Sequence, residues 1–388
     1  MLTDHFLSAE ERAELDLFRQ SLERFCDAEI EPYYAAWEKA GQVPRELFLK
    51  MGEQGCLCAD VPDTHGGPGA PVQFSFAVVE VLSRRGYAGF VGGLQVHNDI
   101  VPPYLLHCGT EAQRAYWLPR MASGKAVAAI GMTEPGAGSD LKALRTTARR
   151  DGDGYVINGS KIFISNGQHA DLLVLAAKTD ASAGAKGVSL FLVDTSTPGF
   201  SRGRNLDKIG QHAGDTSELF FEDMRVPADA LLGGVEGQGF VQMMHELPRE
   251  RLIIGVQALY GARGALDATL EYVQQREAFG QALAQFQNTR FSLAQCATDI
   301  AAAEAFLNAC VHAYTRGELT AEAVSALKLH TTELFSRVAD ACLQLFGGYG
   351  YMAEYPISRF WTDARVLRIY GGTSEIMKEL VARSLLGR

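Results

Sequence analysis

The chain of 388 residues is 47% hydrophobic and 21% charged, and its formal net charge is −10. This composition is typical of a globular protein with a large core, and the length suits two or three domains. The negative charge and the lack of a long basic run argue against a nucleic-acid-binding surface. Residues 1–16 show no secretory signal and no apolar run is long enough for a membrane span, so we expect a cytoplasmic protein.

The seven cysteines are mostly dispersed along the chain and form no Cys-x-x-Cys pair. We therefore predict neither disulfides nor structural zinc. The pattern nearest to a metal motif is Cys56 with Cys58, which lack nearby histidines and are interpreted as small buried residues. The sequence thus predicts no metal site.

Residues 8–121 show a helical pattern, because apolar residues recur at three- and four-residue intervals, as at Leu15, Phe18, Leu22 and Phe25. Two features interrupt this pattern. One is a Gly/Pro loop at 63–71, and the other is Pro102 with Pro103, which must bend or end the preceding helix. We predict an N-terminal helical domain at residues 1–125.

From about residue 126 the sequence changes to short β-rich runs separated by turn signals, such as GYVINGSKIFISNG, DLLVLAAKTD and GVSLFLVDT. The pairs Asn158-Gly159 and Asn166-Gly167 are expected to supply the positive φ angles of tight turns. These features predict a small antiparallel β domain, a sandwich or a barrel, at residues 126–232.

The helical period returns after LLGGVEGQG and continues to the C-terminus, with a helix stop at Gly347 and Gly348. We predict a C-terminal helical bundle at residues 233–388. The fold class is therefore α+β and mostly α, with the order helices, strands, helices.

The glycine-rich stretch GMTEPGAGSD, residues 131–140, is the first candidate for chemistry. Its glycines allow backbone amides to approach a ligand, and Thr133 and Ser139 offer hydroxyls, so the loop suits a phosphate or a flavin edge. A plain turn explains the same residues equally well, because no strand leads into the stretch and no helix clearly follows it.

Four further motifs are weak when taken singly. KIFISNG at 161–167 fits a half-buried strand, and Arg276 in QREAFG is either a partner for a diphosphate or a solvated charge at a helix end. The other two, LQLFGGYGY at 343–351 and YGGTSE at 370–375, are Gly-rich turns.

Together and at these separations, MTEPGAGSD, KIFISNG, QREAFG, QLFGGYGY and YGGTSEIM closely resemble the motifs of the acyl-CoA dehydrogenase family over essentially the whole chain. The stretch ELPRERLI and the tail from residue 349 are most similar to the long-chain branch of that family. The resemblance implies a C-terminal four-helix bundle and a homotetramer. It also implies FAD bound between the β domain, its own bundle and a neighbouring subunit.

The reaction implied by the resemblance is α,β-dehydrogenation of an acyl-CoA thioester to the trans-2-enoyl-CoA. A carboxylate removes the α proton while the β hydrogen leaves as hydride to flavin N5. Electrons then pass to an electron-transferring flavoprotein. The thioester carbonyl needs hydrogen bonds that strengthen as enolate charge develops.

The resemblance also implies two sets of binding residues. Residues 130–139 and 163–165 would contact the flavin and its phosphates, whereas Arg276, Gln287 and residues 344–348 would bind the FAD of the adjacent subunit. The full FAD set is Ile130, Met132, Thr133, Gly138, Ser139, Phe163, Ile164, Ser165, Arg276, Gln287, Gln344, Leu345, Gly347, Gly348, Thr373, Ser374 and Glu375. The substrate set is Ser139, Val241, Arg251, Gly371 and Gly372.

The position of the catalytic base follows from one departure from the family pattern. Many members carry the base in a loop that reads YEGTSE, whereas this chain reads YGGTSE with Gly371 in that place. Gly371 cannot abstract a proton, although its amide can polarise the thioester carbonyl. Other members place the glutamate on a bundle helix, where ELPRERL puts Glu250. The resemblance therefore implies Glu250 as the base and Glu375 as the reserve candidate.

Pro248 stands two residues before Glu250, inside a long helical pattern. One interpretation places Pro248 in the first turn of a helix, with Glu250 as an acid near the positive helix end. Alternatively, Pro248 breaks the helix locally and splays the turn of Glu250 toward the substrate. Arg249 and Arg251 would then point elsewhere, since adjacent side chains on a helix do not share a face.

Two other functions stay open. One is a flavoenzyme of the same fold that acts on a carrier-protein thioester or uses oxygen as an oxidase. The other is a non-catalytic flavin-binding assembly partner. Residues 90–106 are expected to form part of the floor of the acyl pocket, with room left by Gly92 and Gly93.

Overall fold

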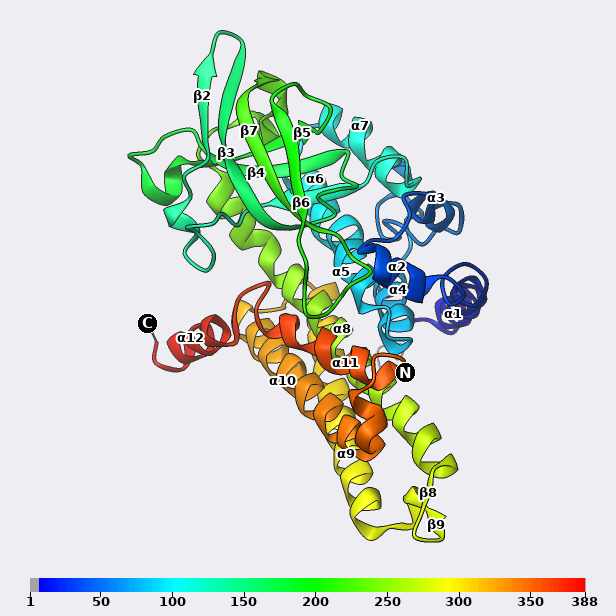
Figure 1. Ribbon diagram of the computed structural model, residues 1–388. Coiled ribbons are helices and arrows are strands. Elements are labelled where there is room, and N and C mark those ends of the chain that lie inside the picture. The colour runs from blue at the N-terminus through cyan, green and yellow to red at the C-terminus, as the bar shows by residue number, and fades with distance from the viewer. Residues whose placement is uncertain (1–6, 388) are drawn as a thin grey trace.

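The computed structural model describes residues 7–387, which follow the order helices, strands, helices (Figure 1). Residues 1–6, which belong to the stretch inspected for a secretory signal, and residue 388 lie outside the described chain. The predicted fold class is confirmed, because helices flank a middle β domain on both sides in sequence. Within the described residues, no helix has the length and apolarity needed to cross a bilayer.

The N-terminal part is a layer of packed helices. Two of them begin with a capping box, Ser8 with Glu11 and Thr110 with Gln113, in which side chain and backbone exchange hydrogen bonds. The helices are α1 (Ala9–Glu29), α2 (Tyr34–Ala40), α3 (Glu46–Glu53), α4 (Val72–Arg84), α5 (Ala88–Gln95), α6 (Val101–Cys108) and α7 (Glu111–Ala122).

Pro102 and Pro103 do not separate two helices. A π-helical turn, η3 at Val96–Ile100, joins α5 directly to α6, and the prolines occupy the first turn of α6. A π turn changes the hydrogen-bond spacing at the point where proline N–H groups are missing. The chain therefore accommodates the prolines by a change of helix type and not by a break.

The middle part is a curved seven-stranded sheet with the order β1-β4-β2-β3-β7-β6, and β5 pairs with β4. Its strands are β1 (Ala128–Gly131), β2 (Thr147–Asp151), β3 (Gly154–Ser165), β4 (Leu172–Lys178), β5 (Val188–Asp194), β6 (Phe200–Asn205) and β7 (Thr216–Pro227). Most pairs are antiparallel as expected, but β1 and β2 each run parallel to β4.

The prediction that Asn158-Gly159 forms a tight turn is wrong. Both residues lie inside β3, where the register against β7 shifts between Ile157 and Gly159. The pair thus belongs to a bulge, and the β2–β3 hairpin turns at Gly152 instead. Asn166 does adopt a positive φ of 60°, directly after β3.

The C-terminal part consists of long helices that pack side by side (Figure 1). They are α8 (Gly239–Gln275), α9 (Gln287–Thr315), α10 (Ala321–Phe346), α11 (Pro356–Ala364) and α12 (Ser374–Leu385), with a short hairpin of β8 (Glu277–Ala278) and β9 (Gln281–Ala282) between α8 and α9. Helix α10 ends at Phe346 with Gly347 at a φ of 58°, so the predicted helix stop is confirmed.

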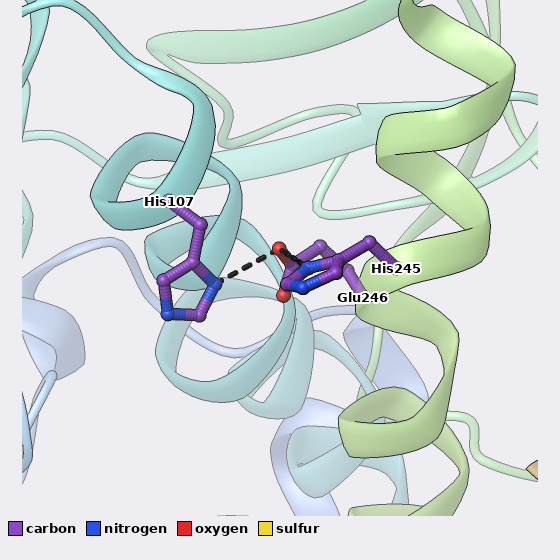
Figure 2. A group of neighbouring side chains, drawn as sticks. All are labelled: His107, His245 and Glu246. Atoms are coloured by element: carbon purple, nitrogen blue, oxygen red, sulfur yellow. Dashed lines mark hydrogen bonds and ion pairs between the residues drawn. The ribbon is translucent and has the colours of Figure 1, made fainter. Parts of the chain in front are cut away.

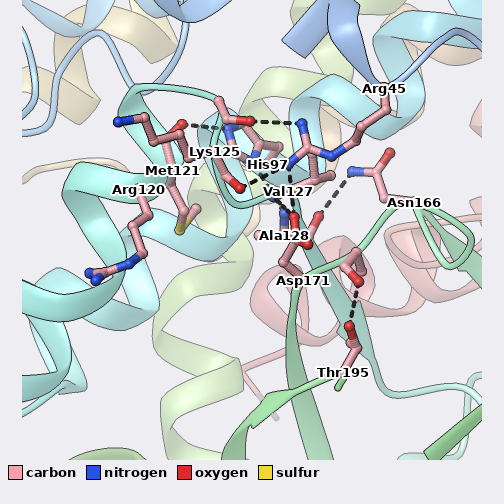
Figure 3. A network of polar contacts seen from close by, with 12 residues as sticks. Arg45, His97, Arg120, Met121, Lys125, Val127, Ala128, Asn166, Asp171 and Thr195 are labelled. Atoms are coloured by element: carbon pink, nitrogen blue, oxygen red, sulfur yellow. Dashed lines mark hydrogen bonds and ion pairs between the residues drawn. The ribbon is translucent and has the colours of Figure 1, made fainter. Parts of the chain in front are cut away.

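A polar network, buried at His97 and partly exposed at Arg45 and Asp171, joins the N-terminal helices to the β domain (Figure 3). The ring of His97 in η3 donates from Nε2 to the Met121 carbonyl at 3.1 Å and accepts at Nδ1 from the Ala128 amide at 3.2 Å. Burial lowers the pKa of His97 to about 4, so the ring is neutral and can fill both roles. Asp171 accepts from Arg45 at 2.9 Å and from the Val127 amide at 2.8 Å. These contacts fix η3 relative to β1.

Candidate active site

Glu250 lies on α8 and is only 7% exposed. Its Oε1 accepts a hydrogen bond of 2.9 Å from the Tyr104 hydroxyl on α6. Burial raises the pKa of Glu250 to about 7, while Tyr104 and the charge of Arg251 act to lower it and the charge of Glu246 acts to raise it. The carboxylate is therefore suited to gain and lose a proton near neutral pH.

The loop after η10 (Arg365–Arg368) is held by two buried cations. Arg251 donates from Nε to the Gly371 carbonyl at 3.4 Å, and Lys328 of α10 donates to the carbonyls of Tyr370, at 2.8 Å, and of Gly372. Burial and the charge of Arg251 lower the pKa of Lys328 to about 7. Two side chains thus bind three consecutive carbonyls of this loop.

Gly371 and Gly372 adopt positive φ angles of 63° and 98°, which residues with a Cβ rarely adopt. A Cβ at Gly371 would also lie 2.4 Å from Cδ1 of Ile254, one helical turn beyond Glu250. This close approach fixes the loop against α8. The structure therefore brings together three of the predicted catalytic and substrate residues, Glu250, Arg251 and Gly371.

The surroundings of Glu250 correct two expectations. Helix α8 is continuous through Pro248, which lies well inside it, so the proline neither starts the helix nor interrupts it. Arg249 turns away as expected and pairs with Asp60 and Asp99. Arg251 instead turns toward the Gly371 loop, and its charge acts on Glu250.

Glu375, the reserve candidate for the base, has a different environment. It is exposed in the first turn of α12, and hydrogen bonds from its own backbone amide and from Thr373 lower its pKa. Ser374 is buried and donates to Glu333 at 2.8 Å, so its hydroxyl is already engaged within the chain. A strong base near neutral pH is therefore better provided by Glu250 than by Glu375.

The first two flavin motifs are joined by hydrogen bonds. The Ile162 amide donates to the Thr133 carbonyl at 3.0 Å, and Lys161 donates to the Met132 carbonyl at 3.2 Å and to Glu134 at 2.8 Å. Contrary to the sequence analysis, a strand, β1, leads directly into the glycine-rich loop. Lys161 and Glu134 were missed because their buried ion pair is not visible from the local sequence.

Phe163 has the most unusual backbone of these residues. Its φ is 62°, at a register shift of β3, and its side chain is 63% exposed. A bulky residue with positive φ is a strained outlier of the kind that concentrates at ligand sites. Ile164 instead packs in the β core, whereas Gly138, Ser139 and, at the start of α8, Val241 are exposed.

A separate cavity of about 510 Å³ lies at the far end of the bundle. Five predicted FAD residues line it, namely Arg276, Gln344, Leu345, Gly347 and Gly348. The Arg276 guanidinium sits 5.4 Å from the ring centre of Tyr349, and the sides of both glycines are open. Gln287 is exposed at the first turn of α9 and does not line this cavity. The Arg276 cation, the open backbone of the two glycines and the volume of the cavity fit a bound phosphate-containing cofactor.

Gly93 does not leave room for an acyl group. A Cβ there would lie 2.1 Å from the amide oxygen of Asn166, whose nitrogen donates to the Gly93 carbonyl at 2.8 Å. The space beside Gly92 is likewise taken by Gln211. The two glycines therefore serve close packing between α5 and the β domain.

The comparisons with known proteins agree with this fold. The chain matches "Acyl-CoA dehydrogenase, N-terminal domain" over residues 12–125, the "middle domain" over 129–224 and the "C-terminal domain" over 237–386. The chain therefore belongs to the acyl-CoA dehydrogenase family, whose enzymes are FAD-dependent oxidoreductases that act on acyl-CoA.

Individual relatives cover nearly the whole chain. The mitochondrial long-chain specific acyl-CoA dehydrogenase of Sus scrofa is 46% identical over 96% of this chain and 87% of its own length. A crystal structure of an acyl-CoA dehydrogenase from Geobacillus kaustophilus is 44% identical, with a TM-score of 0.93 over 98% of this chain and 99% of its own. A structure described as an electron transferring flavoprotein of Acidaminococcus fermentans is 36% identical, with a TM-score of 0.93, and covers 99% of this chain and 100% of its own.

The relatives are not uniform in reaction. An acryloyl-CoA reductase (NADH) of Anaerotignum propionicum is 37% identical over 97% of this chain and 95% of its own. The structure of a prolyl acyl carrier protein oxidase is 28% identical, with a TM-score of 0.90, over 96% of this chain and 98% of its own. Family membership therefore establishes the class of chemistry. The substrate and the electron acceptor have to be inferred from the residues of the site.

We predict that Gly371→Ala destabilises the protein by about 1–3 kcal/mol, because alanine is strained at a positive φ and its Cβ meets Ile254. Ile254→Val deletes the Cδ1 atom concerned, so the double variant should recover the steric part and retain the backbone part. A double-mutant cycle of denaturant midpoints measures both. Gly136→Ala, where a Cβ meets open space, serves as the control. Wild-type stability of Gly371→Ala would contradict the packing described.

Proposed function

We propose that the chain catalyses α,β-dehydrogenation of acyl-CoA thioesters to trans-2-enoyl-CoA, with Glu250 as the base and an electron-transferring flavoprotein as acceptor. The observation that carries the proposal is the buried Glu250, whose pKa is raised to about 7 beside the Gly371 loop. Similarity to the long-chain enzymes supports long acyl groups as preferred substrates.

The proposed chemistry follows from the contacts of the chain's own residues. Glu250 takes the α proton on a carboxylate oxygen, while Tyr104 holds the other side of the carboxyl group in place. The Gly371 amide polarises the thioester carbonyl. Lys328 holds the Tyr370 carbonyl of the same peptide, and Arg251 holds the Gly371 carbonyl of the next, so the amide stays oriented. Bound FAD supplies the acceptor for the β hydride.

The FAD site is proposed to be shared between subunits of a homotetramer. The glycine-rich loop with Phe163 and the Arg276 cavity lie on different parts of one chain, at the β domain and at the far end of the bundle. Residues Thr373 to Glu375 at the start of α12 complete the proposed FAD set. Ser374 would contribute only backbone groups, because its hydroxyl donates to Glu333. The division of the predicted FAD residues over separate surfaces supports one cofactor that contacts two chains.

Two alternatives remain distinguishable by experiment. An oxidase, or an enzyme for carrier-protein thioesters, is supported by the resemblance to the prolyl acyl carrier protein oxidase. Turnover that requires air, or that fails with CoA thioesters and succeeds with carrier-protein thioesters, would favour it. A non-catalytic flavin protein would show no bleaching of the flavin band with any acyl-CoA under anaerobic conditions.

We predict that Glu250→Gln lowers the rate of flavin reduction by acyl-CoA about 10²–10⁴-fold, which is the usual contribution of a general base. FAD content and binding of the enoyl-CoA product should be retained, because the shape of the side chain is kept. Stopped-flow absorbance with a graded series of acyl-CoAs measures the step directly. Near-normal reduction in this variant would remove Glu250 from the mechanism.

A partial rescue provides a second test of the base. Adding Gly371→Glu to Glu250→Gln should restore some activity if both positions reach the same α carbon, but the new side chain meets Ile254. The triple variant with Ile254→Val should therefore be more active than the double variant. Equal inactivity of both would argue against a shared reach.

Tyr104→Phe should move the pH–rate profile of flavin reduction upward by about one pH unit. Its hydroxyl stabilises the charged form of Glu250, so its loss raises the pKa of Glu250 further. The variant should be slow near pH 7 and recover at higher pH. Tyr116→Phe, an exposed tyrosine of α7, is the control. An unmoved or lowered profile would contradict the role of Tyr104.

Arg276→Ala should weaken FAD retention and assembly together, because a charge-assisted contact contributes about 1.5–3 kcal/mol and the cofactor is shared. Gel filtration with absorbance at the flavin band measures both properties. Arg24→Ala, at an exposed arginine of α1, should leave them unchanged. Full flavin content and unaltered assembly in Arg276→Ala would exclude this residue from the site.

A further inference from the structure

His107, His245 and Glu246 form a cluster of potential metal ligands between α6 and α8 (Figure 2). The Nδ1 atoms of both rings lie 2.9 Å from the same carboxylate oxygen, Oε1 of Glu246. One ligand atom from each residue falls within 4.8 Å of the others. Figure 2 shows the carboxylate between the two imidazoles, so the three groups converge on one point.

The cluster combines a rigid anchor with open access. The Glu246 side chain is 4% exposed, whereas those of His107 and His245 are 49% and 67% exposed. A buried carboxylate fixes one ligand, and the exposed rings let an ion enter and leave water molecules on the remaining side. The two rings lie edge to face with centroids 5.7 Å apart, and both Nδ1 atoms face the carboxylate oxygen.

We propose that His107, His245 and Glu246 form a binding site for a divalent transition metal, and that Zn²⁺ is the ion that this set of donors fits best. Two imidazoles and one carboxylate are typical zinc ligands, and a fourth position remains for water. On binding, each Nδ1 must present a lone pair to the metal: an imidazolium ring releases its Nδ1 proton to solvent, and a neutral ring takes the tautomer with its proton on Nε2.

The site lies one helical turn from the Tyr104–Glu250 pair on both helices. Tyr104 and His107 are neighbours along α6, and Glu246 and Glu250 are neighbours along α8. A bound metal would therefore fasten α6 to α8 beside the Tyr104–Glu250 hydrogen bond. This consequence for catalysis rests on the proposed function, whereas metal binding itself does not.

The test is equilibrium dialysis of the metal-stripped holoenzyme against Zn²⁺, followed by counting of zinc and flavin per chain. We expect one Zn²⁺ per chain in the wild type. His107→Ala, His245→Ala and Glu246→Gln should each weaken its binding at least about tenfold, since loss of a ligand costs no less than loss of its outer support. His212→Ala, at an exposed histidine outside the cluster, should bind Zn²⁺ like the wild type.

Thermal unfolding provides an independent readout. Zn²⁺ that bridges two helices binds the folded state only, so it raises the melting temperature. The rise should appear in the wild type and in His212→Ala and be absent in His245→Ala, whose exposed side chain can be removed without disturbing the fold. No zinc in the wild type, or equal zinc in His245→Ala and His212→Ala, would overturn the proposal. Neither result depends on acyl-CoA turnover, so a failure of the zinc proposal can be distinguished from a failure of the proposed function.

Discussion

The burial of one carboxylate between α6 and α8 is the constraint on which the candidate site depends. Removing Glu250 from water favours its neutral form, and only specific contacts can restore the charged form. Tyr104 provides the hydrogen bond and Arg251 the opposite charge. The balance leaves the pKa of Glu250 near 7, where a carboxyl group can act as a base without being permanently ionised.

This balance requires that both helices are held firmly from outside the site. Helix α6 is tied to the β domain through η3, where His97 bridges the carbonyl of Met121 and the amide of Ala128. Helix α8 is anchored through Arg249, which binds Asp60 and Asp99 on two other segments of the N-terminal layer. The neutral ring and the ion pairs are buried where water cannot compete, so each contact is strong and directional.

The sequence predicted the features that depend on long periodic patterns. Helical and strand periods were sufficient for the order of the three parts. The exchange of a glutamate for Gly371 pointed to Glu250, which is buried and whose neighbour Arg251 binds the Gly371 carbonyl. Strand β1 was missed because Ala128–Gly131 is short and made largely of small residues, and its pairing with β4 decides its conformation.

Other features could not be predicted because they join residues far apart in the chain. In the sequence Lys328 is one more residue of a helical pattern. Only the fold shows that it binds the carbonyls of Tyr370 and Gly372. The cluster of His107 with Glu246 likewise has no spacing that a sequence motif would record. The sequence left Pro248 either at the start of a helix or at a local break, but the long packed helix α8 continues through it, because tertiary packing outweighs the local cost.

The hydrogen bonds at the Gly371 loop determine where negative charge can be stabilised in the buried site. Under the proposed function, proton transfer neutralises Glu250 and places negative charge on the thioester oxygen at the Gly371 amide. Lys328 binds the Tyr370 carbonyl at the other end of the same peptide and thereby strengthens the Gly371 amide as a donor, while Arg251 binds the next carbonyl of the loop. The net charge of the region stays constant while its centre moves from the carboxylate toward the polarised Gly371 amide. The reaction therefore displaces charge within a field that already exists, and no new charge has to be created where solvent is excluded.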